Sequence, residues 1–506
     1  MISPARILLI SSLVILQTRA QGIQSFTMGT ATTQLPPSNS IDVLSLSRDT
    51  LWAGTGKGLG YTTNGSAWAI QPQENGISAF AINDEIVWAS EGYTTKDNGN
   101  FIPTGGGLNW STDRGATWTH VPQPVDVGTI DTLSYGANQI RALAITVPQQ
   151  NITYDITLTK STVWIASFAG MLRKSTDRGV SWQRIILPPD NLDSIAPSDT
   201  LNFDLSPAGG SLGLQENLNH RVFSVYASSD SIIWVGTAAG INRSSDGGVS
   251  WRRFSHQNQI SPISGNFVVA INEQVLPSRR ILWASTVNAV DPDEEKGVSF
   301  SSDSGQTWTE TLLGERAHNI AFMDSVVYVA TDRGLFRSSD FGSSWLRNGT
   351  IADPVRQQRF TTEPIYAVAA IGDTIWVGGP DGLAYTLDSP TQPFGASWRI
   401  FRTYQPLGTS SKTYSYPLPF SPDDESVRIH FSTSGKTLNT TIRIFDFAMM
   451  PIRTLIQNTP RTGAMEHDEI WDGRSDHGRR VTNGVYFYRI EFDNGETQWG
   501  KIMVLQ

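Results

Sequence analysis

Five aspartates stand at one fixed position of a repeated phrase, which makes them the first candidates for catalysis or metal binding. The phrase is Ser/Thr-x-Asp-x-Gly-x-Ser/Thr-Trp, and its carboxylates belong to Asp113, Asp177, Asp246, Asp303 and Asp340. In such a phrase Asp can accept backbone N–H groups, Gly can adopt a positive φ, and Trp can anchor the turn in a core. We therefore interpret these carboxylates as structural, with catalysis or metal binding as the alternative.

Two longer stretches between copies of the phrase carry carboxylates beside aromatic or basic side chains. The first holds Glu91, Tyr93, Lys96, Asp97 and Phe101, and the second holds Asp291, Asp293, Glu294 and Glu295; shorter turns add Asp332 and Arg333, together with Lys57, Phe168 and Asp381. Aromatic rings beside carboxylates can hold a glycan. Residues 291–295 offer oxygen ligands for Ca²⁺, although they lack the spacing of a known calcium loop. We predict ligand binding here, with no resident cofactor and Ca²⁺ as the candidate ion; ordinary solvated loops are the alternative.

The composition excludes several other chemistries. The chain has no Cys, so disulfides and thiol catalysis are excluded, and its seven His residues show no metal-ligand spacing. The formal net charge is −9 and the Lys and Arg residues are scattered. A nucleic-acid partner needs a basic stripe, so none is expected.

The repeated phrase belongs to a unit that recurs seven times. Residues 111–118, 175–182, 244–251, 301–308 and 338–345 are close copies, and 62–68 and 386–398 are degenerate ones. Before each copy comes an apolar run with a central aromatic, followed by Gly. A further apolar run precedes that, at 43–47, 77–83, 140–146, 222–228, 267–272, 319–323 and 365–371. Four strand-length segments in each of seven units predict an all-β fold, a seven-bladed β-propeller.

The phrase resembles the Asp-box, or bacterial neuraminidase, repeat. In proteins with this repeat the box turns are structural and lie away from the binding face. The resemblance extends to non-catalytic propellers of the photosystem-II assembly-factor type and to two kinds of glycoside hydrolase. Sialidases need converging arginines and a Tyr–Glu pair, and no Arg-Ile-Pro-like motif precedes the first box. Xyloglucanase-like enzymes bind substrate between two propellers, and only one is expected here.

The pattern changes after residue 402. A Pro-, Ser- and Tyr-rich linker is expected over 403–416, followed by short strands and Asn-Gly or Asp-Gly turns over 417–506. That length suits a small Ig-like β-sandwich. Segments 416–422, 441–446, 471–474, 484–488 and 501–505 resemble the flagellar-hook-capping-type Ig-like domain of exported bacterial proteins. Related modules are sorting signals for type IX secretion, which implies delivery to the outer surface and contact with the export machinery; residues 447–451 depart from that pattern.

The first twenty residues read as a secretory signal peptide. Arg6 is followed by an apolar run too short to span a bilayer and by small residues at 18–20. The expected layout is signal peptide 1–20, propeller 21–402, linker 403–416 and Ig-like module 417–506, secreted or on the cell surface without a membrane span.

The longest loops are expected on one face of the propeller. In a four-stranded meander the boxes lie between strands 3 and 4, so the connections between strands 2 and 3 and between blades lie on the opposite face. Insertions at 92–106 and 288–296 and the crossing 187–220 belong to that face; the insertion 147–159 is expected between strands 1 and 2 of the third blade, on the box face. Because binding resides in loops on rigid scaffolds, recognition is predicted opposite the boxes.

Three classes of function remain. The sequence favours a non-catalytic scaffold that recognises or assembles a protein or glycan partner at the cell surface. The alternatives are a glycoside hydrolase and a structural or adhesive surface protein.

Overall fold

The regular structure of this chain is almost entirely β-strand. The computed structural model describes residues 24–27, 31–33, 36–63, 65, 68–71, 75–97, 100–209, 212–355, 358–360, 362–402, 413–423, 426–463 and 467–505. Within that part the one helical element is a short 3₁₀ turn, η1 (Leu218–His220). The predicted all-β class is confirmed, and the predicted signal peptide lies outside the described residues.

Up to residue 401 the strands form a series of four-stranded antiparallel meanders, each made from consecutive strands. They are β3 (Ile41–Ser47), β4 (Thr50–Thr55), β5 (Gly58–Thr62) and β6 (Trp68–Gln71); β7 (Gly76–Asn83), β8 (Ile86–Asp97), β9 (Asn100–Ser111) and β10 (Thr117–Val121); β13 (Thr153–Leu158), β14 (Val163–Ser167), β15 (Met171–Ser175) and β16 (Gln183–Arg184); β19 (Val222–Ala227), β20 (Ile233–Thr237), β21 (Gly240–Ser244) and β22 (Trp251–Phe254); β23 (Phe267–Val275), β24 (Arg280–Val287), β25 (Gly297–Ser301) and β26 (Thr309–Thr311); β27 (Ala317–Met323), β28 (Val326–Thr331), β29 (Gly334–Ser338) and β30 (Leu346–Arg347); and β33 (Ala367–Ile371), β34 (Thr374–Gly379), β35 (Gly382–Leu387) and β36 (Arg399–Phe401).

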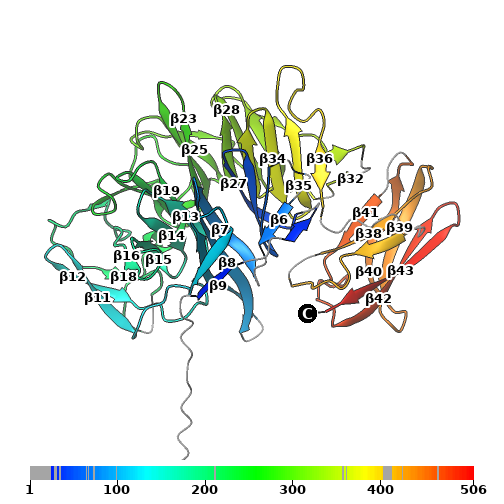
Figure 1. The fold of residues 1–506 in the computed structure, drawn as a ribbon, viewed down its shortest axis with the longest axis horizontal. Helices are drawn as coiled ribbons and strands as arrows, with labels where there is room; N and C mark the ends of the chain where they lie inside the picture. The colour runs from blue at the N-terminus through cyan, green and yellow to red at the C-terminus, as the bar shows by residue number, and fades with distance from the viewer. Residues whose placement is uncertain are drawn as a thin grey trace, which may run out of the picture.

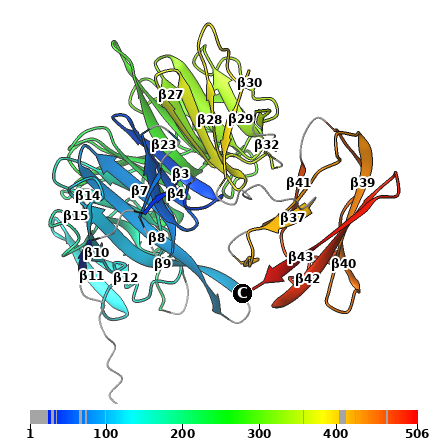
Figure 2. The same ribbon diagram turned by 45° about the vertical axis from the view of Figure 1, so that its right-hand side comes forward.

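The first strand of each meander lies beside the first strand of the next, in the order β3, β7, β13, β19, β23, β27 and β33, and β33 lies beside β3. This is the arrangement of a β-propeller, with the sheets set around a common axis (Figures 1 and 2). The contact between the last and the first meander is apolar: Trp376 and Ala367 share a core with Ile41 and Trp68. Sequence-distant aromatics thus pack between neighbouring sheets, as expected for blades that cannot bury their faces alone.

Two N-terminal strands extend these sheets. β1 (Gln24–Thr27) pairs with β10, and β2 (Ala31–Thr33) pairs with β6. Each adds an antiparallel outer strand, so a segment ahead of the first meander covers the outer edges of two sheets.

The prediction for the third unit was wrong. The alternating segment expected at 140–146 forms β12 (Asn138–Leu143), which belongs to a separate small sheet with β11 (Ile130–Tyr135) and β18 (Asp204–Leu205). The first strand of this meander is β13, within the stretch 147–159 that was predicted as a loop on the box face. Both segments alternate apolar residues, so periodicity alone could not decide between them. The insertion therefore precedes the meander as a crossing, and it pairs with the second long crossing through β18.

The insertion at 92–106 is also different from the prediction. It is no irregular loop: β8 and β9 continue through it as a two-stranded hairpin, with Tyr93 opposite Thr104 and Asp97 opposite Asn100. A register shift between Glu91 and Gly92 accommodates the glycines there. The second insertion, 288–296, does form an irregular loop between β24 and β25.

Three short segments complete the first part of the chain. β17 (Ser194–Ile195) pairs with β22, and β31 (Ala352–Asp353) pairs with β32 (Gln358–Arg359). The second of these pairs lies in the crossing between β30 and β33.

The C-terminal module has two sheets that share one core. One contains β37 (Thr413–Tyr416), β38 (Val427–Phe431) and β41 (His467–Trp471), and the other contains β40 (Pro451–Arg461), β39 (Leu438–Phe445), β42 (Gly484–Phe492) and β43 (Thr497–Val504). Ile429, Ile444, Trp471 and Tyr488 are fully buried between them. Residues 413–416, at the end of the predicted linker, pair with β38, and residues 403–412 lie outside the described part.

Candidate functional site

The five box turns share one geometry, and it occupies their carboxylates. In the first, Ser111 Oγ donates to Asp113 Oδ1 at 2.7 Å, while Thr117 donates its backbone N–H to Oδ1 at 2.8 Å and its hydroxyl to Oδ2 at 2.6 Å. The same three bonds recur, within 0.1 Å, at Asp177, Asp246, Asp303 and Asp340. The carboxylates therefore act within their own turns, which is the structural interpretation of the sequence.

Electrostatics agree with that role. Hydrogen bonds from Ser181 and Ser344 lower the pKa values of Asp177 and Asp340 to about 2. The degenerate last copy differs, because the Asp388 carboxylate accepts hydrogen bonds from Tyr328 and Arg337 of the preceding meander. No group of three or more His, Asp and Glu able to hold a metal occurs among the described residues.

The predicted binding residues of the β8–β9 hairpin serve two structural purposes. Glu91 is buried, and its two oxygens accept from Asn75 at 3.0 Å and Asn109 at 2.7 Å. Near the tip, Lys96 lies 3.5 Å from Asp423 of the C-terminal module, and Phe101 is covered by the Lys96 ammonium and, at 4.5 Å, by a guanidinium of that module, Arg480. Tyr93 is 41 % exposed. The hairpin tip is a contact between the two parts of the chain.

The loop 288–296 is held by its own glutamate. Glu294 is buried, its Oε2 accepts the backbone N–H groups of Ala289 and Asn266 at 2.6 and 3.0 Å, and its Oε1 accepts the Asn266 and Gln257 amides. Asp291 accepts from Gln257 at 3.1 Å. Because protein donors occupy both Glu294 oxygens, Glu294 is not placed to bind calcium. Asp293 and Glu295 are exposed, and a calcium ion at this loop stays a prediction.

The structure brings the remaining predicted residues to the same face but not to one point. Asp332 accepts from His318 Nε2 at 2.7 Å, and Arg333 pairs with Glu315. Among the described residues, no hydrogen bond or ion pair joins the hairpin 92–106 to the loop 288–296.

Asp381, in the turn between β34 and β35, lies in a buried ion-pair cluster. Its carboxylate accepts from Arg402 Nη2 at 2.8 Å and from Arg428 Nε at 3.0 Å, and all three side chains are almost fully buried. Asp468 joins the cluster, where it accepts from Tyr416 at 3.0 Å and His430 at 3.1 Å. Burial opposes ionisation of Asp468, but His430 and the two arginines outweigh it and lower its pKa. This cluster fixes the C-terminal module against the propeller.

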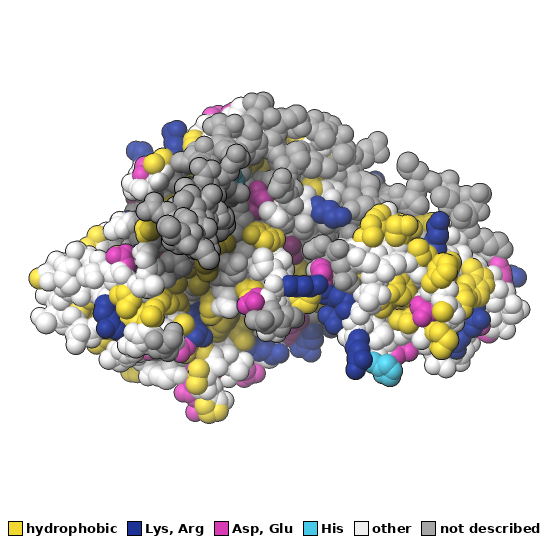
Figure 3. Space-filling view, turned by 90° about the horizontal axis from the view of Figure 1, so that it is seen from below, with side chains coloured by type: hydrophobic (Ala, Val, Ile, Leu, Met, Phe, Trp, Pro, Cys, Tyr) yellow, Lys and Arg dark blue, Asp and Glu magenta, His cyan; other side chains and the backbone are white. Residues whose placement is uncertain are grey.

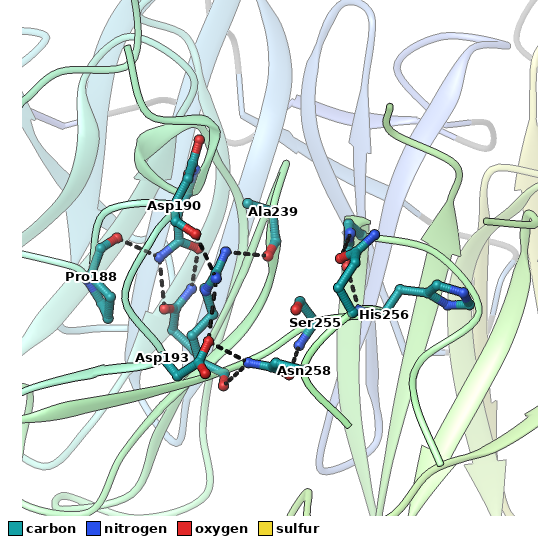
Figure 4. Close-up of polar contacts among 12 residues, drawn as sticks. Pro188, Asp190, Asp193, Ala239, Ser255, His256 and Asn258 are labelled. Atoms are coloured by element: carbon teal, nitrogen blue, oxygen red, sulfur yellow. Dashed lines mark hydrogen bonds and ion pairs between the residues drawn. The ribbon is translucent and has the colours of Figure 1, made fainter. Parts of the chain in front are cut away.

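Side-chain hydrogen bonds hold the described parts of the long crossing, 187–209 and 212–220. Arg253 donates to the Asp190 carbonyl at 2.7 Å, and Asn258 donates to the Asp193 carboxylate at 2.8 Å (Figure 4). The Asp190 carboxylate accepts the N–H groups of Leu218 and Asn219, both at 2.8 Å.

A different set of residues recurs around the propeller axis. Six first strands have a register shift near their start, and each leaves one residue without a cross-strand partner: Asp42, Ser78, Tyr154, Phe223, Val269 and His318. Tyr366, directly before β33, donates its N–H to Gly378 in the equivalent place. We call these seven residues the axial ring. Since first strands start on the face opposite the 3–4 turns, the axial ring lies opposite the boxes.

The axial ring has an aromatic arc and a polar arc. In the aromatic arc the Phe223 ring lies 5.5 Å from Tyr154 and 4.3 Å from Phe267. In the polar arc His318 meets Tyr366 edge to face at 5.3 Å and bonds Asp332. Tyr154 is 39 % exposed, Asp42 is exposed, and the other members are half-buried. β-Bulges re-aim side chains and are frequent beside functional sites.

The polar arc also has perturbed acid–base properties. Although solvent reaches Asp42 along the axis, the surrounding protein desolvates its carboxyl and raises its pKa to about 6, against a hydrogen bond from Ser40. Burial, followed by the charges of Asp42 and Asp332, raises the pKa of Tyr366. Perturbed titratable groups of this kind mark candidate sites.

Sequence reasoning missed the axial ring, yet a signal was present. In five units the ring residue stands exactly ten positions before the aromatic of the second strand, as in Asp42 and Trp52 or Tyr154 and Trp164. A bulge shifts the alternation of a strand by one residue, so the outward residue looks like an irregularity of the pattern.

Comparison with known proteins gives no family. No family model matches the sequence, and no curated protein matches it. Similar solved structures include PorZ of Porphyromonas gingivalis, whose description calls it an essential bacterial surface component of the type-IX secretion system (13 % identity, 91 % of this chain and 64 % of that chain, TM-score 0.38). Others are YCF48 from Cyanidioschyzon merolae (16 %, 71 % and 98 %, 0.43) and the GH74 enzyme of Niastella koreensis (14 %, 93 % and 74 %, 0.49).

This chain spans less than two thirds of the PorZ chain. Identities and scores this low transfer neither an activity nor a partner. Among the residues that the structure describes, no helix has the length and apolar character needed to cross a membrane.

Proposed function

We propose that this protein is an exported, non-catalytic scaffold that recognises a glycan at the cell surface through its axial ring. The observation that carries the proposal is the recurrence of one bulge near the start of six of the seven first strands. It gives each of these sheets a residue without a cross-strand partner at an equivalent place, and these residues differ from sheet to sheet. A repeated backbone device with variable side chains is suited to binding.

The proposal includes a closed seven-bladed propeller with Asp-box turns and an Ig-like C-terminal module. Closure is supported by the apolar contact of the last meander with the first and by their shared core. The Asp-box assignment is supported by the five identical turns, and the module by its two sheets around Trp471. Export rests on the sequence of residues 1–20, and display at the surface rests on the resemblance of the C-terminal module to sorting domains.

The chemistry of the axial ring suits a sugar. Aromatic faces at Tyr154 and Phe223 offer an apolar platform, and Asp42, His318 and Tyr366 offer acceptors and donors for hydroxyls. Sites for small ligands combine mostly apolar walls with a few such polar groups. Asp332 holds His318 at 2.7 Å and so sets the orientation of that ring.

A glycoside hydrolase is the second candidate, and one observation favours it. Asp42 combines a pKa of about 6 with a position on the exposed axial ring, and a raised carboxyl pKa is what a general acid needs. In that case Asp42→Asn abolishes turnover of a chromogenic glycoside. If the protein is a non-catalytic scaffold, the wild type already shows no turnover of this glycoside.

The test is a glycan array followed by titration calorimetry on the chain without residues 1–20. Tyr154→Ala should weaken binding about tenfold, or about 1.4 kcal/mol, through loss of an aromatic platform. Tyr93→Ala is the matched control, because it has the same side chain and a similar exposed fraction but lies on the β8–β9 hairpin. If Tyr93→Ala abolishes binding and Tyr154→Ala does not, the site lies on the hairpin. If neither glycan nor peptide binds, a structural or adhesive role is favoured.

A further inference from the structure

A second candidate site lies where the propeller meets the C-terminal module. A cleft of about 520 Å³ opens between the crossing that follows β30 and the strands β40 and β41. We call it the junction cleft. Four arginines line it, Arg333, Arg347 and Arg359 from the propeller and Arg461 from the module. On the face seen from below, Figure 3 shows that Lys and Arg side chains also gather where the two parts meet.

Positive charge exceeds negative charge in the junction cleft. Its lining has four arginines against two glutamates, Glu363 and Glu469. Arg347 pairs with Glu363 at 3.2 Å, and Arg461 pairs with Glu469. Arg333 pairs with Glu315, outside the lining. Arg359 has no ion pair among the described residues; its charge, with that of Arg461, acts on Glu469 and counters the rise that burial causes in the pKa of that carboxyl.

Two buried donors in the same lining lack hydrogen-bond partners. They are Arg359 Nε and the hydroxyl of Thr362, both shielded from solvent in the described part of the chain. Buried polar groups are normally satisfied, and leaving one unpaired is costly. Thr362 also lines a smaller pocket of about 270 Å³ beside Arg428, so this residue borders two hollows.

We propose that the junction cleft binds the oxyanion of a ligand, a carboxylate, phosphate or sulfate group. A planar guanidinium matches the oxygens of such a group, and several acceptor atoms on one anion can satisfy both Arg359 and Thr362. The site is separate from the axial ring and does not depend on it. Because the lining comes from both parts of the chain, a bound anion bridges the propeller and the C-terminal module.

The first experiment is titration calorimetry on the chain without residues 1–20, with phosphate, sulfate and glucuronate as probes at constant ionic strength. We expect saturable binding of at least one probe at one site, weakened at least tenfold by Arg359→Gln. Preference for glucuronate over phosphate and sulfate identifies an acidic sugar as the source, and the reverse order identifies a phosphorylated or sulfated ligand. Arg279→Gln is the control, since Arg279 is exposed and lies over Phe341 at a box turn. Equal binding by wild type and Arg359→Gln, or no binding of any probe at millimolar concentration, overturns the proposal.

Thr362→Val provides a second test, because it should raise stability without anions and lower the affinity for them. Valine has nearly the shape of threonine but no hydroxyl to leave unpaired, so the melting temperature without anions should rise. The same change should weaken anion binding and reduce the rise in melting temperature that the anion produces. A variant that melts lower without anions, and keeps the full anion-induced shift, contradicts the role assigned to this hydroxyl.

Discussion

The box turns and the axial ring both recur from blade to blade, but they repeat different things. Each box turn repeats the residues themselves, and the same carboxylate bonds return within 0.1 Å. The axial ring repeats only a backbone position, which is a bulge in six of its seven members, and its side chains range from Asp42 to Val269. A device that shapes the scaffold needs the same side chains in every copy, whereas a surface that recognises an asymmetric ligand needs different ones. The two faces of one propeller are therefore built under different constraints.

The largest loss of stability is expected at a box tryptophan. Trp251 is 2 % exposed and packs with Trp164 and Val235, so Trp251→Ala should lower the free energy of unfolding by about 3–5 kcal/mol through the cavity it leaves. Denaturant unfolding measures the change. Tyr154→Ala, in the axial ring, should cost less, about 1–2 kcal/mol, because that side chain is 39 % exposed and its ring loses the contact with Phe223. Equal losses of unfolding free energy at the two positions would contradict the distinction between a structural box face and a binding face.

A smaller effect is expected at a box carboxylate. Asp246 accepts from the N–H groups of Val249 and Ser250 and from two hydroxyls, so Asp246→Ala should cost about 1–3 kcal/mol. Asp246→Asn keeps one acceptor oxygen and should cost less than Asp246→Ala. Both variants should bind glycan like the wild type, which calorimetry on folded protein checks. Altered specificity with unchanged stability would make the boxes functional.

The sequence predicted the box turns well because their information is local. Ser, Asp, Gly and Trp within eight residues determine a turn whose bonds all lie inside the phrase, and six of the seven first strands were also located. The third was misplaced because 140–146 alternates as regularly as Thr153–Leu158, and only packing against β7 and β19 decides which one joins the ring. The β8–β9 hairpin was predicted as a loop because residues 92–106 lengthen the usual spacing between the second-strand aromatic and the Gly, and spacing alone does not show whether an insertion forms paired strands.

The candidate site was much harder to predict. The predicted binding residues were chosen as polar side chains in long insertions. Several of them, such as Glu91, Glu294 and Lys96, satisfy buried amides or hold the C-terminal module. The length of an insertion indicates that it has a role, but it does not distinguish ligand binding from contacts that support the fold. The axial ring needs the spatial neighbours of seven strands far apart in sequence, and a single sequence without homologues carries that information only in the ten-residue spacing to the aromatic.

The smallest effect expected is a difference in pH dependence between the two kinds of carboxylate. Asp177 and Asp340 have folded-state pKa values near 2, below the ordinary value, so their stabilisation is complete above about pH 4 and is lost as the pH falls through 2. Asp42 has the opposite sign, since its folded-state pKa is about 6. Its ionised form is disfavoured in the folded protein, so stability declines as the pH rises from about 4 to 6 and then stays level.

Asp42→Asn isolates this term, because Asp155, on β13, also has a raised pKa, of about 7. The melting temperature of Asp42→Asn, relative to wild type, should rise between pH 4 and pH 6 and then stay constant. Asp177→Asn should show its largest deficit above pH 4 and a shrinking one toward pH 2. Thermal melts at unit intervals of pH measure both. A flat curve for Asp42→Asn would mean that Asp42 is as well hydrated as an ordinary surface carboxylate. It would then lack the raised pKa that a general acid, or a group that exchanges a proton on ligand binding, requires.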